Sequence, residues 1–361
     1  MNIYYYGIFK VQGGIETFAK NLIDEIKSKR EDINFIILAI TPTIAYEDFL
    51  SSLGCKIIHL PNPAKHPFAF LKQLNGVLNN ANHDDIVQLN VCSYRNIMLF
   101  QACKKTNAKT IVVSHYTKIG DGRIPFLHYL SRRYYRKLGI KVGVSNDAAN
   151  FMFGQKTPRV IIPNGINAAL YSFSIEKRNK VRQQIGIDDE TLLIGQIGRI
   201  SKEKNQCHSI SVMNEFHKSN PNSKLLFVGK EYDPEPRKLV DFSNSNHFIS
   251  FFGEVIDGVN EIYSALDIVF FPSLHEAVGL SLLECAANGV PTIVSSNVPQ
   301  LSNMPNLHYL DLFIDEWVAK TNQLKNDKLC RVNYVLNSVY TISACANGYL
   351  NIYDNFDQYL K

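Results

Sequence analysis

No stretch of the sequence approaches the run of about 18 apolar residues that a membrane-spanning helix needs. The first ten residues, MNIYYYGIFK, do not follow the basic, apolar and small-residue order of a signal peptide, and they predict a strand instead. The cysteines form no C-x-x-C pair, which favours buried thiols in a reducing compartment. We therefore expect a cytoplasmic protein or one peripheral on the inner face of the cell membrane. The cysteines are Cys55, Cys92, Cys103, Cys207, Cys285, Cys330 and Cys345.

Motifs that hold metals or dinucleotides are also missing. No aspartate belongs to a D-x-D motif, and the sequence contains neither an H-E-x-x-H motif nor a dense cluster of His and Cys. These absences predict no metal site and no cofactor. The absence of G-x-G-x-x-G argues against a dinucleotide-binding protein.

Positive charge is concentrated in the first half of the chain. The whole sequence of 361 residues carries a formal net charge of +5. Residues 1–163 contain 21 Lys+Arg against 11 Asp+Glu, a net +10, whereas the remainder contains 17 against 22, a net −5. Ten basic residues and one acid fall within 104–141. This asymmetry predicts an anionic partner for the first half.

Short apolar segments alternate with amphipathic ones in two successive sets, as parallel α/β sheets require. The length favours two domains. We expect the α/β class, with two doubly wound Rossmann-like lobes facing across a cleft. The Asn-Gly turn at 163–165 is the expected seam, which gives domains 1–163 and 164–345 and a terminal helix in 346–361. The strand candidates are NIYYYGIF, NFIILAI, CKIIHLP, DIVQLNV, AKTIVVSH and IKVGVS, then LLIGQIG, SKLLFVG, HFISFFG, DIVFFPS and VPTIVSS.

The segment QGGIE (12–16) places Gly13 and Gly14 where a strand gives way to a helix. Glycine lets a ligand approach the backbone closely, and the amides at a helix N-terminus attract anions. The alternative is a tight strand-to-helix turn that binds nothing.

The segment GRISKEK (198–204) follows the apolar strand candidate LLIGQI. Arg199 and Lys204 would then lie in a loop at the carboxyl end of a strand, where fixed cations can hold phosphates. The alternative is a solvated charged loop.

A carboxylate interrupts the apolar stripe of the segment HEAVGLSLLECAANGVP. Leu280, Leu283 and Ala287 recur at helical spacing, and Glu284 lies within the same stripe. Because an unpaired buried carboxylate is costly, a partner must meet it, and a vicinal diol such as ribose is one candidate. The alternative is a partly exposed glutamate at the edge of the stripe.

The start of the same helix offers a second anion site. Its first amides belong to about Val278, Gly279 and Leu280, where a phosphate can bind without a specialised side chain. Glu276 precedes the helix and can reach the expected cleft. Together with the cations of GRISKEK, this arrangement predicts a diphosphate site that works without a metal ion.

Two further residues stand at expected strand ends. His115 follows the strand candidate TIVVS, where a catalytic role and a structural role both remain open. Ser145 in VGVSNDAA is predicted to cap a helix N-terminus.

Basic and aromatic residues are mixed in FLHYLSRRYYRKL (126–138), which predicts a helix. Such a helix can attract anionic lipid head groups or a lipid pyrophosphate acceptor, with each basic residue contributing roughly 1 kcal/mol near the surface. The alternative is a solvated helix face, and nucleic acid is not predicted because no recognised motif accompanies the charge. The basic residues of this patch are Arg132, Arg133, Arg136 and Lys137.

In chain order, these segments resemble the retaining family 4 glycosyltransferases, which have two Rossmann-like lobes in the GT-B architecture. The resemblance covers nearly the whole chain, and its most specific part is the Glu276/Glu284 pair with seven residues between them. The terminal helix is similar to the closing helix of that family, which crosses back to the first lobe. The other segments are GGIE (13–16), SHYTK around His115, VGVSN (142–146), IIPNGIN (161–167) and IGRISKEKN (197–205).

The resemblance implies a role for each matching residue. Arg199 and Lys204 would bind the diphosphate of a nucleotide-sugar donor, and Glu284 would hold its ribose. Glu276 would contact the transferred sugar, and His115 would lie beside the reacting sugar. The other implied donor contacts are Gly13, Gly14, Val278, Gly279 and Leu280.

The resemblance also implies the reaction. A sugar would move from a nucleotide sugar, UDP-linked in our expectation, to a glycan or polyprenyl-diphosphate-linked oligosaccharide in capsule or exopolysaccharide synthesis. The anomeric configuration would be retained, with the leaving phosphate taking the acceptor's proton, so that no protein nucleophile is needed. The sequence departs from the family pattern at Asn167, where an acid is usual, and at Ala277, where glycine is frequent. The alternatives are a sugar-nucleotide epimerase of the same shape and a non-catalytic two-lobed sugar-binding protein.

Overall fold

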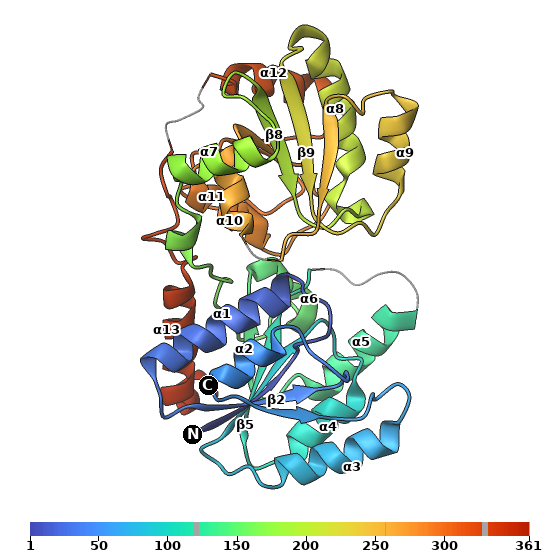
Figure 1. The fold of residues 1–361 in the computed structure, drawn as a ribbon. Coiled ribbons are helices and arrows are strands. Elements are labelled where there is room, and N and C mark those ends of the chain that lie inside the picture. Colours follow the sequence, from blue (N-terminus) through green and yellow to red (C-terminus); the bar gives the residue numbers. More distant parts are fainter. Residues whose placement is uncertain (118–122, 257, 327–330, 361) are drawn as a thin grey trace. The chain divides into compact units, whose positions relative to one another are not determined.

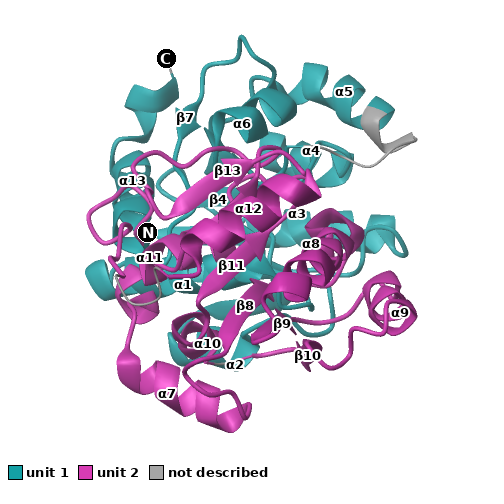
Figure 2. Cartoon of the chain, turned by 90° about the horizontal axis from the view of Figure 1, so that it is seen from above, with its two compact units in different colours: residues 1–166, 342–361 teal, residues 167–341 magenta. Residues whose placement is uncertain are grey.

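The chain, shown here as a computed structural model, folds into two compact units. The first comprises residues 1–166 with 342–361, and the second comprises residues 167–341 (Figures 1 and 2). Each contains a parallel sheet flanked by helices, so the predicted α/β class with two Rossmann-like units is confirmed. The structure describes residues 1–117, 123–256, 258–326 and 331–360.

Unit 1 is built on a seven-stranded sheet within its described residues. Neighbouring strands pair in parallel, and the register places Tyr5 of the first strand beside Gln88. In sheet order the strands are β3 (Lys56–His59), β2 (Asn34–Ala39), β1 (Asn2–Tyr6), β4 (Ile86–Val91), β5 (Lys109–Ser114), β6 (Ile140–Gly143) and β7 (Val160–Ile161). Its helices are α1 (Gly14–Lys29), α2 (Glu47–Ser52), α3 (Pro67–Leu78), α4 (Ile97–Lys105), α5 (Arg123–Tyr135), α6 (Asn146–Phe153) and α13 (Ile342–Asp354), with a 3₁₀ turn at Phe356–Leu360.

Alternation along β1 divides the unit 1 core between the two faces of the sheet. Tyr4 and Tyr6 pack in one apolar cluster with residues of α3 and α4. Tyr5 faces the other way and is fully buried. After the second unit, the chain returns to unit 1 as α13, where Tyr353 donates a hydrogen bond to Gln88 Oε1 at 2.6 Å. The terminal helix is therefore part of the first unit.

The unit boundaries differ slightly from the expected ones. The second unit begins at Asn167 rather than 164 and ends at Thr341 rather than 345. The chain leaves unit 1 after Ile166 and re-enters it at Ile342. The backbone N–H of Ile342 donates to Ile166 O at 2.8 Å, which joins these two points of the chain. Helix α13 also starts at Ile342 and packs against α1, which draws four residues more than expected into unit 1.

Unit 2 is built on a six-stranded parallel sheet in the described part of the chain. One core cluster joins the sheet to two helices through Ile194, Met213, Phe216 and Trp317. In sheet order the strands are β10 (Ile249–Gly253), β9 (Ser223–Val228), β8 (Leu192–Ile197), β11 (Ile268–Phe271), β12 (Thr292–Ser295) and β13 (Leu307–Leu310). The helices are α7 (Ile175–Gln184), α8 (Gln206–Ser219), α9 (Glu235–Phe242), α10 (Val259–Ala265), α11 (Leu280–Asn288) and α12 (Ile314–Leu324), with 3₁₀ turns η1 (Ala168–Tyr171) and η2 (Lys202–Lys204).

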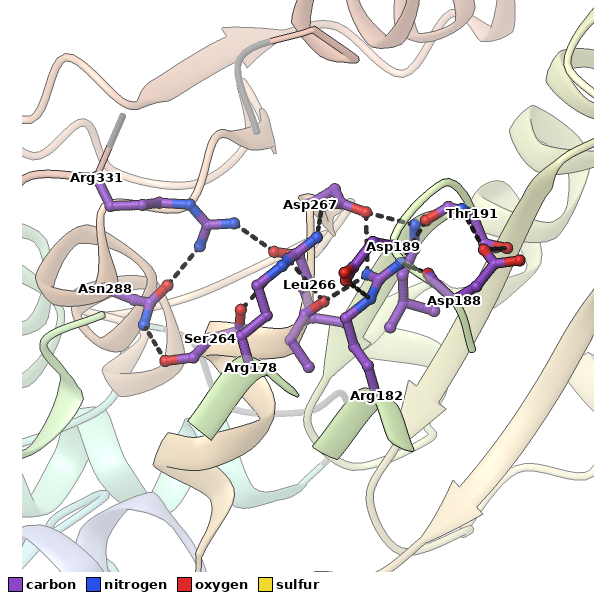
Figure 3. Close-up of polar contacts among 12 residues, drawn as sticks. Arg178, Arg182, Asp188, Asp189, Thr191, Ser264, Leu266, Asp267, Asn288 and Arg331 are labelled. Carbon is purple, nitrogen blue, oxygen red and sulfur yellow. Dashed lines mark hydrogen bonds and ion pairs between the residues drawn. The ribbon is translucent and has the colours of Figure 1, made fainter. Parts of the chain in front are cut away.

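Three arginines cover the C-terminal end of α10, as Figure 3 shows. Arg178 and Arg182 donate to Ala265 O at 3.2 and 3.0 Å, and Arg331 donates to Leu266 O. The last carbonyls of a helix have no partner within it, and cations there also oppose the negative end of the helix dipole. The buried carboxylate of Asp267 balances part of this charge, accepting from Arg178 at 2.7 Å and from Arg182 at 3.3 Å.

Local predictions fare differently in the structure. Ser145 caps α6 as predicted, because its side chain accepts a hydrogen bond from Ala148 N at 3.2 Å. The predicted helix 126–138 is displaced: α5 covers Arg123–Tyr135, and a turn follows before Gly139, whose φ of +60° an ordinary residue rarely adopts. The six described cysteines are free thiols, whereas Cys330 lies outside the described residues.

Candidate active site

Two loops meet at the carboxyl edge of the unit 2 sheet. Strands β8 and β11 are neighbours, so the loop after Ile197 and the loop after Phe271 leave the sheet side by side. Backbone and side chain bonds tie them together: Leu274 N donates to Glu203 O at 2.8 Å, and Gln196 Nε2 donates to Lys204 O at 2.7 Å. Residues that lie more than 70 positions apart are thereby placed in one site.

An ion pair joins these loops. Lys204 Nζ lies 2.5 Å from Glu276 Oε1, and each side chain is 17 % exposed, so the pair is partly shielded but within reach of a ligand. The ammonium also lies 5.0 Å from the centre of the Phe271 ring, a cation–π contact. Lys204 is therefore held by Gln196 of β8, Phe271 of β11 and Glu276 of the following loop. Arg199 is exposed on the same loop as Lys204.

Glycine opens space beside this lysine. Gly198 has a φ of +143°, and the tightest approach is at Gly229, where a Cβ would lie only 2.0 Å from Gly198 O. Both positions therefore require glycine. The backbone just beyond β8 and β9 can approach this closely because Gly229 carries no side chain.

The second predicted anion site is the start of α11. Gly279 occupies the N-cap position and makes no side-chain cap bond, so the helix is left with first-turn amides of Leu280 and Ser281 that have no partner within the helix. A Cβ on Gly279 would lie 3.0 Å from the Phe271 ring. The helix end thus sits close to the ring that also contacts Lys204, an arrangement suited to a phosphate group.

Glu284, one turn into α11, meets two tyrosines that sequence reasoning missed. Tyr171 Oη donates to its Oε1 at 2.9 Å, and Tyr263 Oη donates to its Oε2 at 2.7 Å. Burial raises the pKa of the Glu284 carboxyl above its ordinary value, while both phenol bonds and the charge of Lys204 lower it. The Glu284 residue as a whole is partly exposed, and each of its carboxylate oxygens accepts one phenol hydrogen bond.

In unit 1, Gly13 and Gly14 lie at the start of α1, as predicted. Gly13 is the N-cap in an extended conformation, and a Cβ there would lie 2.9 Å from the carboxylate of Glu16. The buried Glu16 carboxyl group therefore already lies at this helix end. A phosphate at the same point would meet that carboxyl group as well as the exposed backbone.

His115 lies just after β5 and faces inward. Its ring is 6 % exposed, packs against Phe18, and its Nε2 donates to Asn90 Oδ1 at 3.0 Å. The Asn90 amide donates to Tyr6 O, which identifies Oδ1 as the acceptor for the histidine. Burial lowers the pKa of His115 to about 4, so it is neutral at pH 7. Lys118 of the same motif lies outside the described residues.

The basic segment divides into one inward and three outward residues. Arg132 lies over the Tyr129 ring and donates to Phe151 O at 3.3 Å, which turns it toward α6. Arg133, Arg136 and Lys137 are exposed. The structure thus keeps three of the four predicted basic residues on the surface.

Comparisons with known proteins agree with this architecture. Residues 177–306 match the family model described as Glycosyl transferases group 1. The chain is 22 % identical over 304 residues to the putative glycosyltransferase EpsF of Bacillus subtilis, covering 80 % of this chain and 77 % of EpsF. It is 24 % identical over 225 residues to the O-antigen biosynthesis glycosyltransferase WclY of Escherichia coli, covering 59 % of this chain and 60 % of WclY.

Solved structures show the same fold. The crystal structure of Anabaena Alr3699/HepE in complex with UDP superimposes with a TM-score of 0.76 at 16 % identity, covering 100 % of this chain and 99 % of that one. The two parallel α/β units and this likeness define the two-domain GT-B fold. Residues 177–306 therefore form a Glycosyl transferases group 1 domain, and the resemblance to glycosyltransferases inferred from the motifs is confirmed at that level.

Proposed function

We propose that this protein transfers a sugar from a UDP-sugar to a glycan or polyprenyl-diphosphate-linked oligosaccharide in envelope polysaccharide synthesis, with retention of configuration and without a metal ion. The observation that carries the proposal is the meeting of Lys204, Glu276 and the start of α11 at one edge of the unit 2 sheet. The names of WclY and of the UDP complex of HepE support the pathway and the nucleotide.

Each group would have a distinct task. Lys204, Arg199 and the first amides of α11 would stabilise the diphosphate as negative charge develops on it. Glu276 would accept hydrogen bonds from the transferred sugar. The bond from the anomeric carbon to the phosphate oxygen breaks, a bond to the acceptor oxygen forms on the same face, and the acceptor's proton passes to the leaving diphosphate. The role of His115 beside the reacting sugar stays a prediction, because its neutral side chain is buried within unit 1.

The proposal is tested by incubating the protein with a panel of nucleotide sugars, with and without a lipid-linked or free glycan acceptor, in buffer containing a chelator. Product release from one UDP-sugar, with the linkage configuration of the donor kept, is the expected result. Conversion of the donor sugar without acceptor would instead identify an epimerase, and activity lost with the chelator would contradict metal independence.

Glu284→Gln should raise the donor KM roughly ten- to a hundredfold, because a charge-assisted bond to a ribose hydroxyl becomes a neutral one. The substitution keeps the size of the side chain, and the fold should persist. Steady-state kinetics with the active donor measure the effect. Glu261→Gln, which changes a partly exposed glutamate paired with Lys180, is the matched control, and equal kinetics in both variants would remove Glu284 from the donor site.

We also propose that α5 docks on an anionic membrane surface. Phe126, Leu130 and Tyr134 recur at a spacing of four and are 70, 60 and 59 % exposed, so they form one outward apolar stripe. The exposed Arg133 and Lys137 lie beside it. This combination suits an interfacial helix. Among the described residues, no helix is long and apolar enough to span a bilayer.

Reversing charge with Arg133→Glu and Lys137→Glu should weaken binding to phosphatidylglycerol vesicles roughly tenfold or more, since each cation contributes about 1 kcal/mol near such a surface. Vesicle sedimentation measures the bound fraction. Lys65→Glu, at an exposed lysine elsewhere in unit 1, should bind as the wild type does. If neutral phosphatidylcholine vesicles bind equally well, the electrostatic part of the proposal is wrong.

A further inference from the structure

Both oxygens of the Glu284 carboxylate already have a phenol donor. Tyr171 comes from η1, Tyr263 from α10 and Glu284 from α11, so three separate elements converge on one carboxylate. The two phenol rings also contact each other edge to face, with centroids 5.9 Å apart. The two tyrosine residues are 8 and 0 % exposed, which leaves their rings little freedom to rotate away.

A polar network fixes the backbone that carries these tyrosines. Asn288, at the end of α11, donates through Nδ2 to Tyr171 O at 3.0 Å and to Ser264 Oγ at 3.2 Å. Arg331 in turn donates to Asn288 Oδ1 at 2.6 Å (Figure 3). Ser264 directly follows Tyr263, and its carbonyl accepts a hydrogen bond from Arg178, one of the three arginines at the C-terminal end of α10 that we call the arginine cap of α10. The backbones that carry the two phenols are therefore held by the same network.

The two phenol hydrogen bonds do not use the full acceptor capacity of the Glu284 carboxylate. An ionised carboxylate has about four acceptor positions, and the phenols use one on each oxygen. The second position on each oxygen can accept a hydroxyl, and two adjacent oxygens match two adjacent hydroxyls. We propose that Tyr171 and Tyr263 are positioning residues that hold Glu284 for the cis-diol of a ribose and so select ribonucleotides over 2′-deoxyribonucleotides. This inference rests on the proposed donor site.

The phenols also influence the charge of Glu284. Burial favours the protonated carboxyl, and hydrogen bonds to the charged form counteract that effect. Removing a phenol hydroxyl should therefore raise the pKa of Glu284 further. As the pH falls, a variant without the phenols should lose nucleotide affinity at a higher pH than the wild type does.

The test compares Tyr171→Phe, Tyr263→Phe and the double variant with the full-length wild-type chain. Calorimetry measures the Kd of UDP, ADP and GDP and of their 2′-deoxy forms between pH 5 and 8. The wild type should prefer a ribonucleotide roughly tenfold or more, as expected for a bond to a charged group. In the double variant this ratio should fall below about threefold, with the single variants between.

Tyr353→Phe is the matched control, because it removes another buried, hydrogen-bonded phenol hydroxyl in unit 1 and should keep the wild-type ratio. Emission from Trp317 monitors the fold of unit 2, and the single variants carry the test if the double variant does not fold. An unchanged ratio and pH profile in folded Phe variants overturn the inference, as does a wild type that binds ribo and deoxy forms equally. A wild type that binds none of the nucleotides overturns the proposed function, and this inference with it.

Discussion

Lys204→Ala should lower donor kcat/KM by about 100- to 1,000-fold while the protein stays folded. This lysine contacts the same Phe271 ring that lies against the start of α11, and losing one preorganised charge donor at a developing anion has effects of that order. The variant also leaves Glu276 without its partner 2.5 Å away, so an uncompensated carboxylate would face the incoming diphosphate. Initial rates over a range of donor concentrations measure the loss.

Lys202→Ala is the control for this experiment, because Lys202 is an exposed lysine of the same 3₁₀ turn. It changes the net charge by the same amount and should leave kcat/KM within about twofold of the wild type. If Lys204→Ala were as active as this control, the diphosphate would not be held at this edge of the sheet. The donor site proposed for unit 2 would then have to be abandoned.

Asp267→Ala should destabilise unit 2 by about 3–5 kcal/mol. The carboxylate accepts from Arg178, from Arg182 and from Leu193 N at 2.8 Å, and its side chain is 1 % exposed. Removing it leaves two buried guanidiniums without their counter-charge, which is the costly way to break a buried ion pair. Urea unfolding followed by fluorescence reports on this unit, because Trp317 is the single tryptophan of the chain and is fully buried there.

Asp189→Ala provides the comparison within the same network. Asp189 lies 3.8 Å from Arg182 Nε, but its side chain is 82 % exposed, so solvent screens the interaction. The expected change is within about 1 kcal/mol. A similarly small change for Asp267→Ala would show that the arginine cap of α10 does not depend on this carboxylate.

Prediction from the sequence succeeded where the physical cause is local. The alternation of apolar segments is set by strand and helix periodicity, and the start of α1 at Gly14 and the Ser145 cap depend on residues within one turn. The sequence also allowed the loops of Lys204 and Glu276 to be placed near each other, because parallel strands bring the loops at their carboxyl ends to one edge of the sheet.

Prediction failed where partners come from distant parts of the chain. Nothing near Glu284 indicates that Tyr171, 113 positions earlier, would donate to it. The inward orientation of His115 depends on Asn90 of the neighbouring strand, and that of Arg132 depends on Phe151 O. Sequence periodicity identifies the face on which a residue lies, but it does not identify which atom lies opposite.

The sequence by itself therefore determined two α/β units, the loops that carry the candidate site and the concentration of basic residues in the first half. Tertiary structure alone decided the hydrogen-bond partners of the polar side chains, including those of the candidate site. The physical reason is that burial strongly favours a partner for each polar group, and only the packed chain determines which groups are within reach. Glu284 illustrates both levels: its stripe indicated that something must meet the carboxylate, and the fold supplied two phenols.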